Sequence, residues 1–212
     1  MPQPWGASVL ALDTATAHHL GRVLRRTDGA AVSYTDGAGT VGDGRLSDDV
    51  VERGPERVVE PPPRITIAAS APHSVDRARY LVEKCAELGV SRIVWITTEH
   101  GQGRPPREEK ARAWAAAALR QSRGAHLTDV DGPQPLSSLV ATGNVLVAGP
   151  NGRSAHAIEW RPPLTIVIGP EGGLTAEEAG ELPQLTLGDR ILRTETAAVV
   201  AAAIALQSVG RA

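Results

Sequence analysis

Apolar segments of two lengths alternate along the chain from residue 64 onward, and this rhythm constrains the fold more than any other feature. Short runs such as 64–70 (RITIAAS) and 91–97 (SRIVWIT) have the length and β-branched content of buried strands. Longer segments with helical spacing lie between them. Alternating strands and helices are typical of an α/β domain with a mostly parallel sheet, which is the fold class that we expect. The expected strands are 64–70, 91–97, 145–148, 164–168 and 185–187, and the expected helices are 75–88, 106–121 and 194–209.

A run of three prolines, Pro61-Pro62-Pro63, precedes this rhythm and predicts a domain boundary. Such a run cannot continue a helix or a central strand, and it forms a stiff connector. Before it, Asp-Gly turn signals at residues 27–29, 35–37 and 42–44 separate short β-prone runs and indicate hairpins. One helix is expected around residues 15–24. We therefore expect a small strand-rich domain over residues 1–62 and an α/β domain over residues 63–212.

Composition excludes several functional classes. Aromatic residues make up 3% of the 212 residues and Phe is absent, so a site that stacks several bases on aromatic rings is not expected. The single cysteine, Cys85, excludes an intrachain disulfide and a cysteine zinc cluster, and its helix position predicts buried packing. The six histidines lack metal-ligand spacing, so no metal is expected. Neither a signal peptide nor a membrane span is predicted, and we expect a cytoplasmic enzyme.

Charge is unevenly distributed although the net charge is only −2. Residues 1–60 carry a net −3, whereas residues 100–126 carry a net +4. Basic residues of this second segment and of the first expected helix could contact phosphate groups of a partner, or they could simply be solvated. Both interpretations stay open for the four candidates, which are Arg22, Arg25, Arg120 and Arg123.

The stretch from Ile166 to Glu178 (IVIGPEGGLTAEE) predicts a strand, a glycine-rich turn and a helix. Thr175 and Glu178 have the spacing of a capping box for that helix. Glycines in the turn would let backbone N–H and C=O groups approach a ligand closely. The pattern is neither a dinucleotide fingerprint nor a phosphate-binding P-loop, so a plain tight turn remains an equally good interpretation.

The stretch from Leu185 to Ala197 (LTLGDRILRTETA) repeats the order strand, glycine loop and helix. Thr194 is a natural N-cap, and Glu195 in the first turn suits the helix dipole. Arg193 is not explained in this way, because a cation at a helix N-terminus is unfavourable. We therefore expect Arg193 to have a partner: an internal carboxylate, a substrate phosphate or a cofactor carboxylate.

Together these two stretches resemble the signature loops of the SPOUT (trefoil-knotted) methyltransferases, in particular the family that methylates N3 of a uridine in 16S ribosomal RNA. Three further segments are similar to that family's motifs, and all five occur in the family's order between residues 18 and 208. The three segments are 19–25 (HLGRVLR), 83–90 (EKCAELGV) and 117–122 (AALRQS).

The resemblance implies an N-terminal PUA-like β-barrel that binds RNA and a C-terminal domain with a deep trefoil knot, an exception to the usual topology rules. It also implies a homodimer, with ribosomal RNA or the assembled small subunit as partner and S-adenosylmethionine as cofactor. Glu171 would be a loop anchor rather than a catalytic group. The cofactor residues carried over are Ala148, Gly149, Ile168, Gly169, Pro170, Glu171, Gly172, Leu187, Gly188, Ile191, Leu192, Arg193, Thr196 and Ala197.

The implied reaction needs two catalytic roles, because uridine N3 is a weak acid that loses a proton as it attacks the methyl group. Arg193 is the candidate for stabilising the uracil anion and positioning the substrate. Glu195 is the candidate for the base or for a group that orients the base. The structural alternative for Glu195 is an ion pair with Arg193 or Arg190.

Departures from the family pattern fall on the substrate side. The family places a lysine after the first strand of the catalytic domain, where this chain has Ala71-Pro72-His73-Ser74. His100 stands where the family has an arginine, and the sequence Gln121-Ser122-Arg123-Gly124 shifts another arginine by one position. These departures keep two alternatives open. One is a methyltransferase of the same fold that acts on a small molecule or peptide, and the other is an inactive protein that retains the cofactor pocket.

Overall fold

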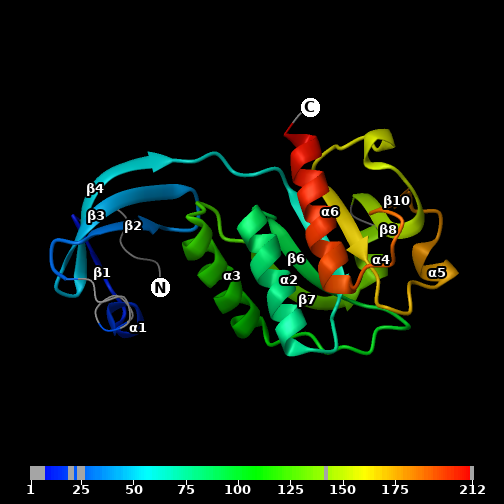
Figure 1. The fold of residues 1–212 in the computed structure, drawn as a ribbon, viewed down its shortest axis with the longest axis horizontal. Helices are drawn as coiled ribbons and strands as arrows, with labels where there is room; N and C mark the ends of the chain where they lie inside the picture. The colour runs from blue at the N-terminus through cyan, green and yellow to red at the C-terminus, as the bar shows by residue number, and fades with distance from the viewer. Residues whose placement is uncertain (1–7, 19–21, 23–26, 141–142, 211–212) are drawn as a thin grey trace. The chain divides into compact units, whose positions relative to one another are not determined.

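The computed structural model describes residues 8–18, 22, 27–140 and 143–210. The chain forms two compact units (Figure 1). The first comprises residues up to Pro61 together with Arg123–His126, and the second comprises Pro62–Ser122 and the chain from Leu127 onward. The division in the chain thus lies within the proline run.

The N-terminal unit contains a four-stranded antiparallel sheet in the order β1-β4-β3-β2. Leu10, Leu46 and Val51 of its strands form a small apolar core. A short helix, α1 (Thr14–His18), follows the first strand. Of the helix expected around residues 15–24, the structure describes α1 up to His18 and then Arg22 alone. The strands are β1 (Val9–Ala11), β2 (Ala31–Thr35), β3 (Thr40–Ser47) and β4 (Val50–Val58).

Of the three predicted Asp-Gly turns, residues 35–37 connect β2 to β3, residues 27–29 form a turn before β2, and the third prediction is wrong. The Asp36 carboxylate accepts the backbone N–H groups of Ala38 and Thr40, which closes the β2–β3 turn. Residues 42–44 instead lie inside β3, where the register with β4 shifts. Gly42 lies under the ring of Tyr34, where a Cβ would come within 2.5 Å of the ring. The glycines there accommodate a bulge and an aromatic ring, and not a turn.

The four residues Arg123–His126 follow a helix of the C-terminal unit but belong to the N-terminal one. Gly39 donates its N–H to the Ala125 carbonyl, and the His126 ring Nε2 lies 2.9 Å from the Val59 carbonyl oxygen. These contacts join segments that are distant in sequence, so local patterns give no signal for them.

The C-terminal unit is built on a six-stranded sheet in the order β10-β8-β9-β5-β6-β7, and every adjacent pair is parallel. This confirms the α/β class with a parallel sheet. Strand β7 was not predicted, because Gly132, Pro133 and Pro135 interrupt it, and prolines are tolerated at a sheet edge. The strands are β5 (Ile65–Ser70), β6 (Arg92–Thr97), β7 (Asp129–Pro135), β8 (Asn144–Arg153), β9 (Leu164–Ile168) and β10 (Gln184–Leu185).

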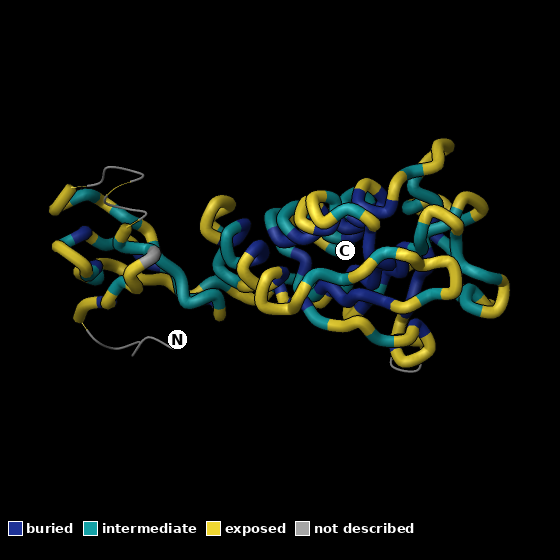
Figure 2. Tube along the Cα trace, turned by 90° about the horizontal axis from the view of Figure 1, so that it is seen from below, coloured by how far each residue is buried: buried dark blue, intermediate teal, exposed yellow. Residues whose placement is uncertain are grey.

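Alternate residues of each strand point to opposite faces of the sheet, which divides the core in two. Ile65 and Ile67 of β5 pack under the three long helices, whereas Ala68 belongs to a second cluster under α4 (Leu136–Val140). Figure 2 shows the buried stretches of this unit gathered along its strands and helices. The long helices are α2 (Val75–Leu88), α3 (Glu108–Ser122) and α6 (Thr194–Val209); α5 (Ala176–Ala179) and the 3-10 helix Ala155–Ala157 are short.

The bounds of α2 and α6 agree with those predicted, and Gly89 ends α2 in the left-handed conformation. Cys85 is buried in the core, as predicted, and burial raises the pKa of its thiol to about 12. A thiol in that state is not a nucleophile at neutral pH. No helix in the described part of the chain is long and apolar enough to span a membrane.

Arg123 adopts a left-handed backbone conformation, with φ of 56°, directly after the last residue of α3. This conformation costs a residue with a Cβ roughly 1–2 kcal/mol, and glycine avoids the cost. We expect Arg123→Gly to raise the free energy of unfolding by about 1 kcal/mol, measured by urea denaturation followed by circular dichroism. The matched control is Arg120→Gly in the last turn of α3, where the backbone is helical and glycine should lower the free energy of unfolding. A lower stability of Arg123→Gly would contradict this account.

Candidate active site

The candidate site lies at the carboxyl edge of the parallel sheet. Strand β5 is central, with β6 on one side and β9 on the other, and the chain order reverses direction across the sheet at β5. Ligands of open α/β sheets bind outside the carboxyl ends of the strands at such a switch point. Both glycine loops identified in the sequence start from this edge.

Strand register brings the first group of predicted cofactor residues together. Val147 of β8 is paired with Val167 of β9, so Ala148 and Gly149 emerge beside Ile168 and Gly169. Ala148 is half-buried against the core, and Ile168 is fully buried. Pro170 follows Gly169 and accepts the N–H of Gly173 through its carbonyl, which folds the glycine-rich turn back on itself.

The second glycine loop follows β10, which pairs with β8. Leu187 and Leu192 pack partly against the core, while Gly188 is exposed and has a φ of 124°. Ile191 is 97% exposed, which is unusual for a large apolar side chain. Half-buried leucines, an uncovered isoleucine and exposed glycine backbone suit a ligand with an apolar part that also hydrogen-bonds to main-chain groups.

Helix α6 begins beside the first glycine loop. The N-cap is Arg193, with extended φ and ψ and no side-chain cap, so the prediction of Thr194 as N-cap is wrong. Thr194 is buried as the first helical residue, and its hydroxyl donates to the carbonyl of Gly169 over 3.1 Å. This hydrogen bond ties the start of α6 to the end of β9. Ala197 follows on the buried face, and Thr196 is exposed.

Arg193 remains a cation at a helix N-terminus without an obvious internal partner. Its side chain is exposed, and none of the ion pairs among the described residues includes it. Of the partners expected for Arg193, an internal carboxylate is therefore not observed in the described part of the chain. A ligand would satisfy it.

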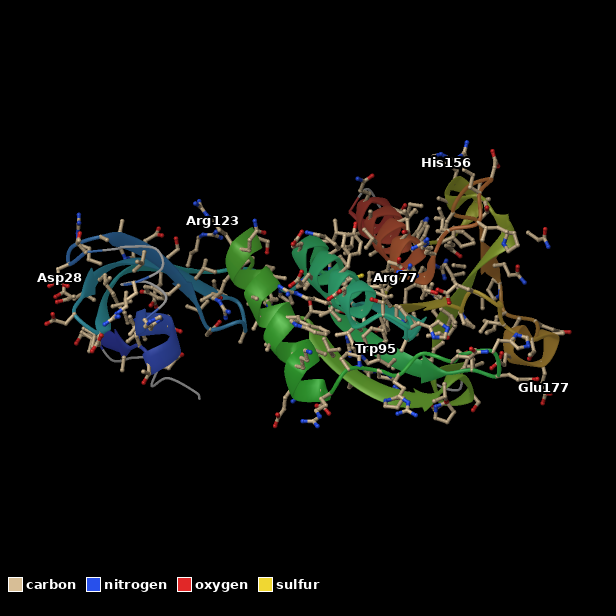
Figure 3. The ribbon with its side chains drawn as sticks, turned by 60° about the horizontal axis from the view of Figure 1, so that its bottom comes forward. Asp28, Arg77, Trp95, Arg123, His156 and Glu177 are labelled. Carbon is tan, nitrogen blue, oxygen red and sulfur yellow. The ribbon has the colours of Figure 1, made fainter. Side chains whose placement is uncertain are left out.

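Glu195 is buried between two helices. Its Oε1 lies 3.6 Å from Nε of Arg77 in the first turn of α2, and its Oε2 is buried with no hydrogen-bond partner in the structure. The alternative considered for Glu195, an ion pair with Arg193 or Arg190, is not formed. Figure 3 labels Arg77 on α2, close to α6. Sequence reasoning missed Arg77, because nothing local marks it as the partner of a carboxylate on the last helix.

A polar pocket of about 430 Å³ opens at this edge. Its lining comes from the loops after β5, β6 and β9, so it lies at the switch point itself. Glu171 and Gly172, expected at the cofactor site, are on its wall and are exposed. The other lining residues are His73, Glu99, His100 and Gln102.

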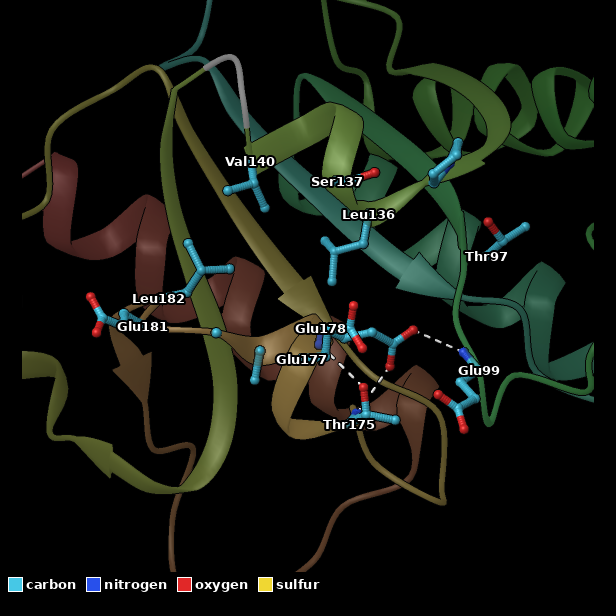
Figure 4. Close-up of a pocket in the computed structure, with 13 residues that line it drawn as sticks. Thr97, Glu99, Leu136, Ser137, Val140, Thr175, Glu177, Glu178, Glu181 and Leu182 are labelled. Atoms are coloured by element: carbon cyan, nitrogen blue, oxygen red, sulfur yellow. Dashed lines mark hydrogen bonds between the residues drawn. The ribbon is translucent and has the colours of Figure 1, made fainter.

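A larger pocket of about 900 Å³ lies between α4 and α5 and contains none of the predicted site residues (Figure 4). Its wall includes the capping box, which is confirmed: the Glu178 carboxylate accepts the N–H of Thr175, and the Thr175 hydroxyl accepts that of Glu178. Glu178 also accepts the N–H of Glu99, which ties the loop after β6 to α5. The pocket at the switch point is smaller, but Glu171 and Gly172 of the first glycine loop line it.

The candidate RNA-contacting arginines are partly described. Arg22, Arg120 and Arg123 are exposed, and Arg25 lies outside the described residues. Arg120 is in the last turn of α3, whereas Arg22 and Arg123 belong to the N-terminal unit. Within the described chain, no group of three or more His, Cys, Asp or Glu side chains could hold a metal ion.

The Arg77–Glu195 contact generates a stability prediction. Arg77→Met leaves a buried carboxylate without its cation, and we expect the free energy of unfolding to fall by about 1–3 kcal/mol. Adding Glu195→Gln should recover most of that loss, because the buried charge is then removed. The control is Arg79→Met on the exposed face of α2, which breaks a surface pair with Glu83 and should cost at most about 0.5 kcal/mol. Equal losses in urea denaturation for Arg77→Met and Arg79→Met would refute the contact's importance.

Comparison with known proteins places this geometry in a family. Residues 59–206 match the model of the RNA methyltransferase domain. The ribosomal RNA small subunit methyltransferase E of Synechocystis sp. is 29% identical over 225 residues, which cover 92% of this chain and 72% of that protein. The protein of the same name from Mycobacterium bovis is 27% identical. The alignment covers 93% of this chain and 86% of that protein.

Solved structures agree. A probable rRNA-methyltransferase from Porphyromonas gingivalis matches with a TM-score of 0.81 and 26% identity, over 93% of this chain and 92% of that one. A ribosomal RNA small subunit methyltransferase E from Neisseria gonorrhoeae, bound to S-adenosyl methionine, matches with a TM-score of 0.81 and 25% identity. The match covers 95% of this chain and 92% of that one. The family resemblance of the loop motifs is thereby confirmed, and the chain belongs to the RNA methyltransferase domain family.

Proposed function

We propose that the protein transfers a methyl group from S-adenosylmethionine to N3 of a uridine in the 16S ribosomal RNA of the small subunit. The observation that carries this proposal is the family match over residues 59–206, which contains every loop of the candidate site. Similar proteins are named for methylation of small-subunit ribosomal RNA, and one was solved with S-adenosyl methionine bound. These names favour ribosomal RNA over a small molecule or peptide as substrate.

In this proposal the cofactor lies against the ends of β8 and β9 and the loop after β10. The half-buried side chains Ala148, Leu187 and Leu192 offer it an apolar wall, and Ile191 covers it. The exposed backbone of Gly188 supplies main-chain hydrogen bonds, and Gly149, Gly169 and Pro170 shape the facing wall. Once bound, S-adenosylmethionine supplies a positively charged sulfonium whose methyl carbon accepts a nucleophile.

Arg193 acts on the substrate in this proposal. It is exposed at the start of α6, directly beside the glycine loop, and is not engaged in any ion pair of the described chain. A cation there stabilises the negative charge that develops on the uracil as its N3 proton leaves. Glu195 has the second of its two expected roles, that of a positioning group, because its carboxylate is buried and faces Arg77.

We further propose the finer architecture that the family resemblance implies. The N-terminal unit serves as a PUA-like RNA-binding domain, and its four-stranded antiparallel sheet is compatible with part of such a barrel. The chain after β8 forms the knot, with β10 paired back onto β8. The protein works in the cytoplasm as a homodimer, and sedimentation at micromolar concentration measures that state.

Methyl transfer tests the function directly. Purified protein should move labelled methyl from S-adenosylmethionine to small subunits or naked 16S RNA, and calorimetry should detect binding of the cofactor. At saturating S-adenosylmethionine we expect Arg193→Gln to lower the transfer rate by roughly 10²–10³-fold, as for the loss of one group that stabilises a developing anion. Arg161→Gln, an exposed arginine paired with Glu159, is the control and should leave the rate unchanged. No transfer by the wild-type protein to either RNA form would refute the function.

The salt dependence of RNA binding tests whether the candidate arginines contact RNA phosphates. Arg22→Gln and Arg120→Gln should each weaken binding and reduce the slope of log affinity against log salt by about 1, because each loses one phosphate contact. Arg79→Gln, also exposed but on α2, is the matched control and should keep the slope. Unchanged slopes for Arg22→Gln and Arg120→Gln would show that these arginines are merely solvated.

A further inference from the structure

His100 occupies a defined position in the pocket at the switch point. It follows β6 and lines the pocket together with His73, Glu171 and Gly172. A Cβ on Gly172 would lie 3.1 Å from Cβ and 3.4 Å from Cγ of His100, so the imidazole packs directly on the backbone of the glycine-rich turn. The histidine therefore stands beside the loop expected to hold the cofactor.

The hydrogen bond of the ring determines its tautomer. Nδ1 of His100 lies 3.2 Å from the carbonyl oxygen of Gly173. A carbonyl can only accept, so Nδ1 carries the hydrogen when the imidazole is neutral. Nε2 then has a free lone pair and is the ring nitrogen left to act on a molecule in the pocket. A backbone carbonyl that orients an imidazole in this way leaves the other nitrogen ready to accept a proton.

The loop that carries His100 is held at both ends. The Ser70 hydroxyl lies 3.0 Å from that of Thr98, and the Glu99 N–H donates to Glu178. Gly103 packs so closely on Ala71 that a Cβ there would collide with the Ala71 carbonyl oxygen. These contacts join the loops after β5 and β6, and they keep the imidazole in place.

The charged and titratable groups around His100 come from each neighbouring element: His73 after β5, Glu99 on its own loop, Glu171 after β9 and Glu178 on α5. The Arg193 guanidinium is a donor without a lone pair for a proton, and Glu195 is buried against Arg77.

We propose that His100 is the general base for methyl transfer, an inference that rests on the proposed function. Nε2 of His100 takes the proton from uracil N3, and the N3 electron pair forms a bond to the methyl carbon of the sulfonium. The bond between sulfur and that carbon breaks with its electrons going to sulfur. The products are 3-methyluridine, S-adenosylhomocysteine and an imidazolium, which returns its proton to solvent.

The test is the pH profile of the transfer rate in wild type and His100→Asn. The amide nitrogen of Asn replaces Nδ1 as donor to Gly173 but offers no basic nitrogen. In wild type, kcat should rise with pH, because only a neutral imidazole accepts a proton. His100→Asn should lower kcat by about 100-fold or more and lose that limb of the profile, with unchanged affinity for S-adenosylmethionine and for RNA. His156→Asn, an exposed histidine on the 3-10 helix, should behave as wild type.

The outcomes separate this inference from the proposed function. A wild-type protein that transfers methyl while His100→Asn keeps both its rate and its pH profile overturns the role of His100 alone. A His100→Asn protein that loses RNA affinity with kcat unchanged also overturns it, because His100 is then a binding residue. Absence of transfer by the wild type overturns both proposals. Normal cofactor affinity in calorimetry shows that the variant is folded.

Discussion

Parallel pairing of the central strands is the constraint on which the rest of this structure depends. Because β5, β6, β8 and β9 run in one direction in register, the loops that follow them all emerge at one edge. Short strands of Val, Ile and Ala build that sheet, and its two faces are buried under separate clusters. The edge is thereby rigid, while the loops themselves are free to carry polar and glycine residues. A site assembled from four distant segments needs such a frame.

Helix α6 packs beside this edge and fixes the positions of two candidate site residues, Arg193 and Glu195. Its buried face is almost entirely alanine, so it can lie close to β5 and β9, and the Thr194 hydroxyl joins its first turn to Gly169. That close approach brings Arg193 beside the glycine loop and buries Glu195 against Arg77. Burying a carboxylate with one unpartnered oxygen costs free energy, so this contact does not stabilise the fold as a fully paired one would.

Much of the architecture could be predicted from local patterns. The bounds of α2 and α6 followed from apolar periodicity and terminal glycines, and the capping box at Thr175 from its spacing. The failures have physical reasons. Strand β7 contains prolines that an edge position tolerates, and the glycines at 42–44 accommodate the ring of Tyr34 in a strand instead of a turn. Thr194 has a side chain typical of an N-cap, but its hydroxyl donates to the carbonyl of Gly169, which follows β9.

The sequence by itself determined the α/β class and the family, because strand length, helix period and loop motifs are local properties. Only the tertiary structure decided which side chains meet. It paired Glu195 with Arg77, and it placed His100 on the backbone of the glycine-rich turn with Nδ1 bound to Gly173. Those contacts join residues that are far apart in the sequence of the C-terminal unit. Their geometry depends on strand order and register, which no stretch of sequence encodes alone.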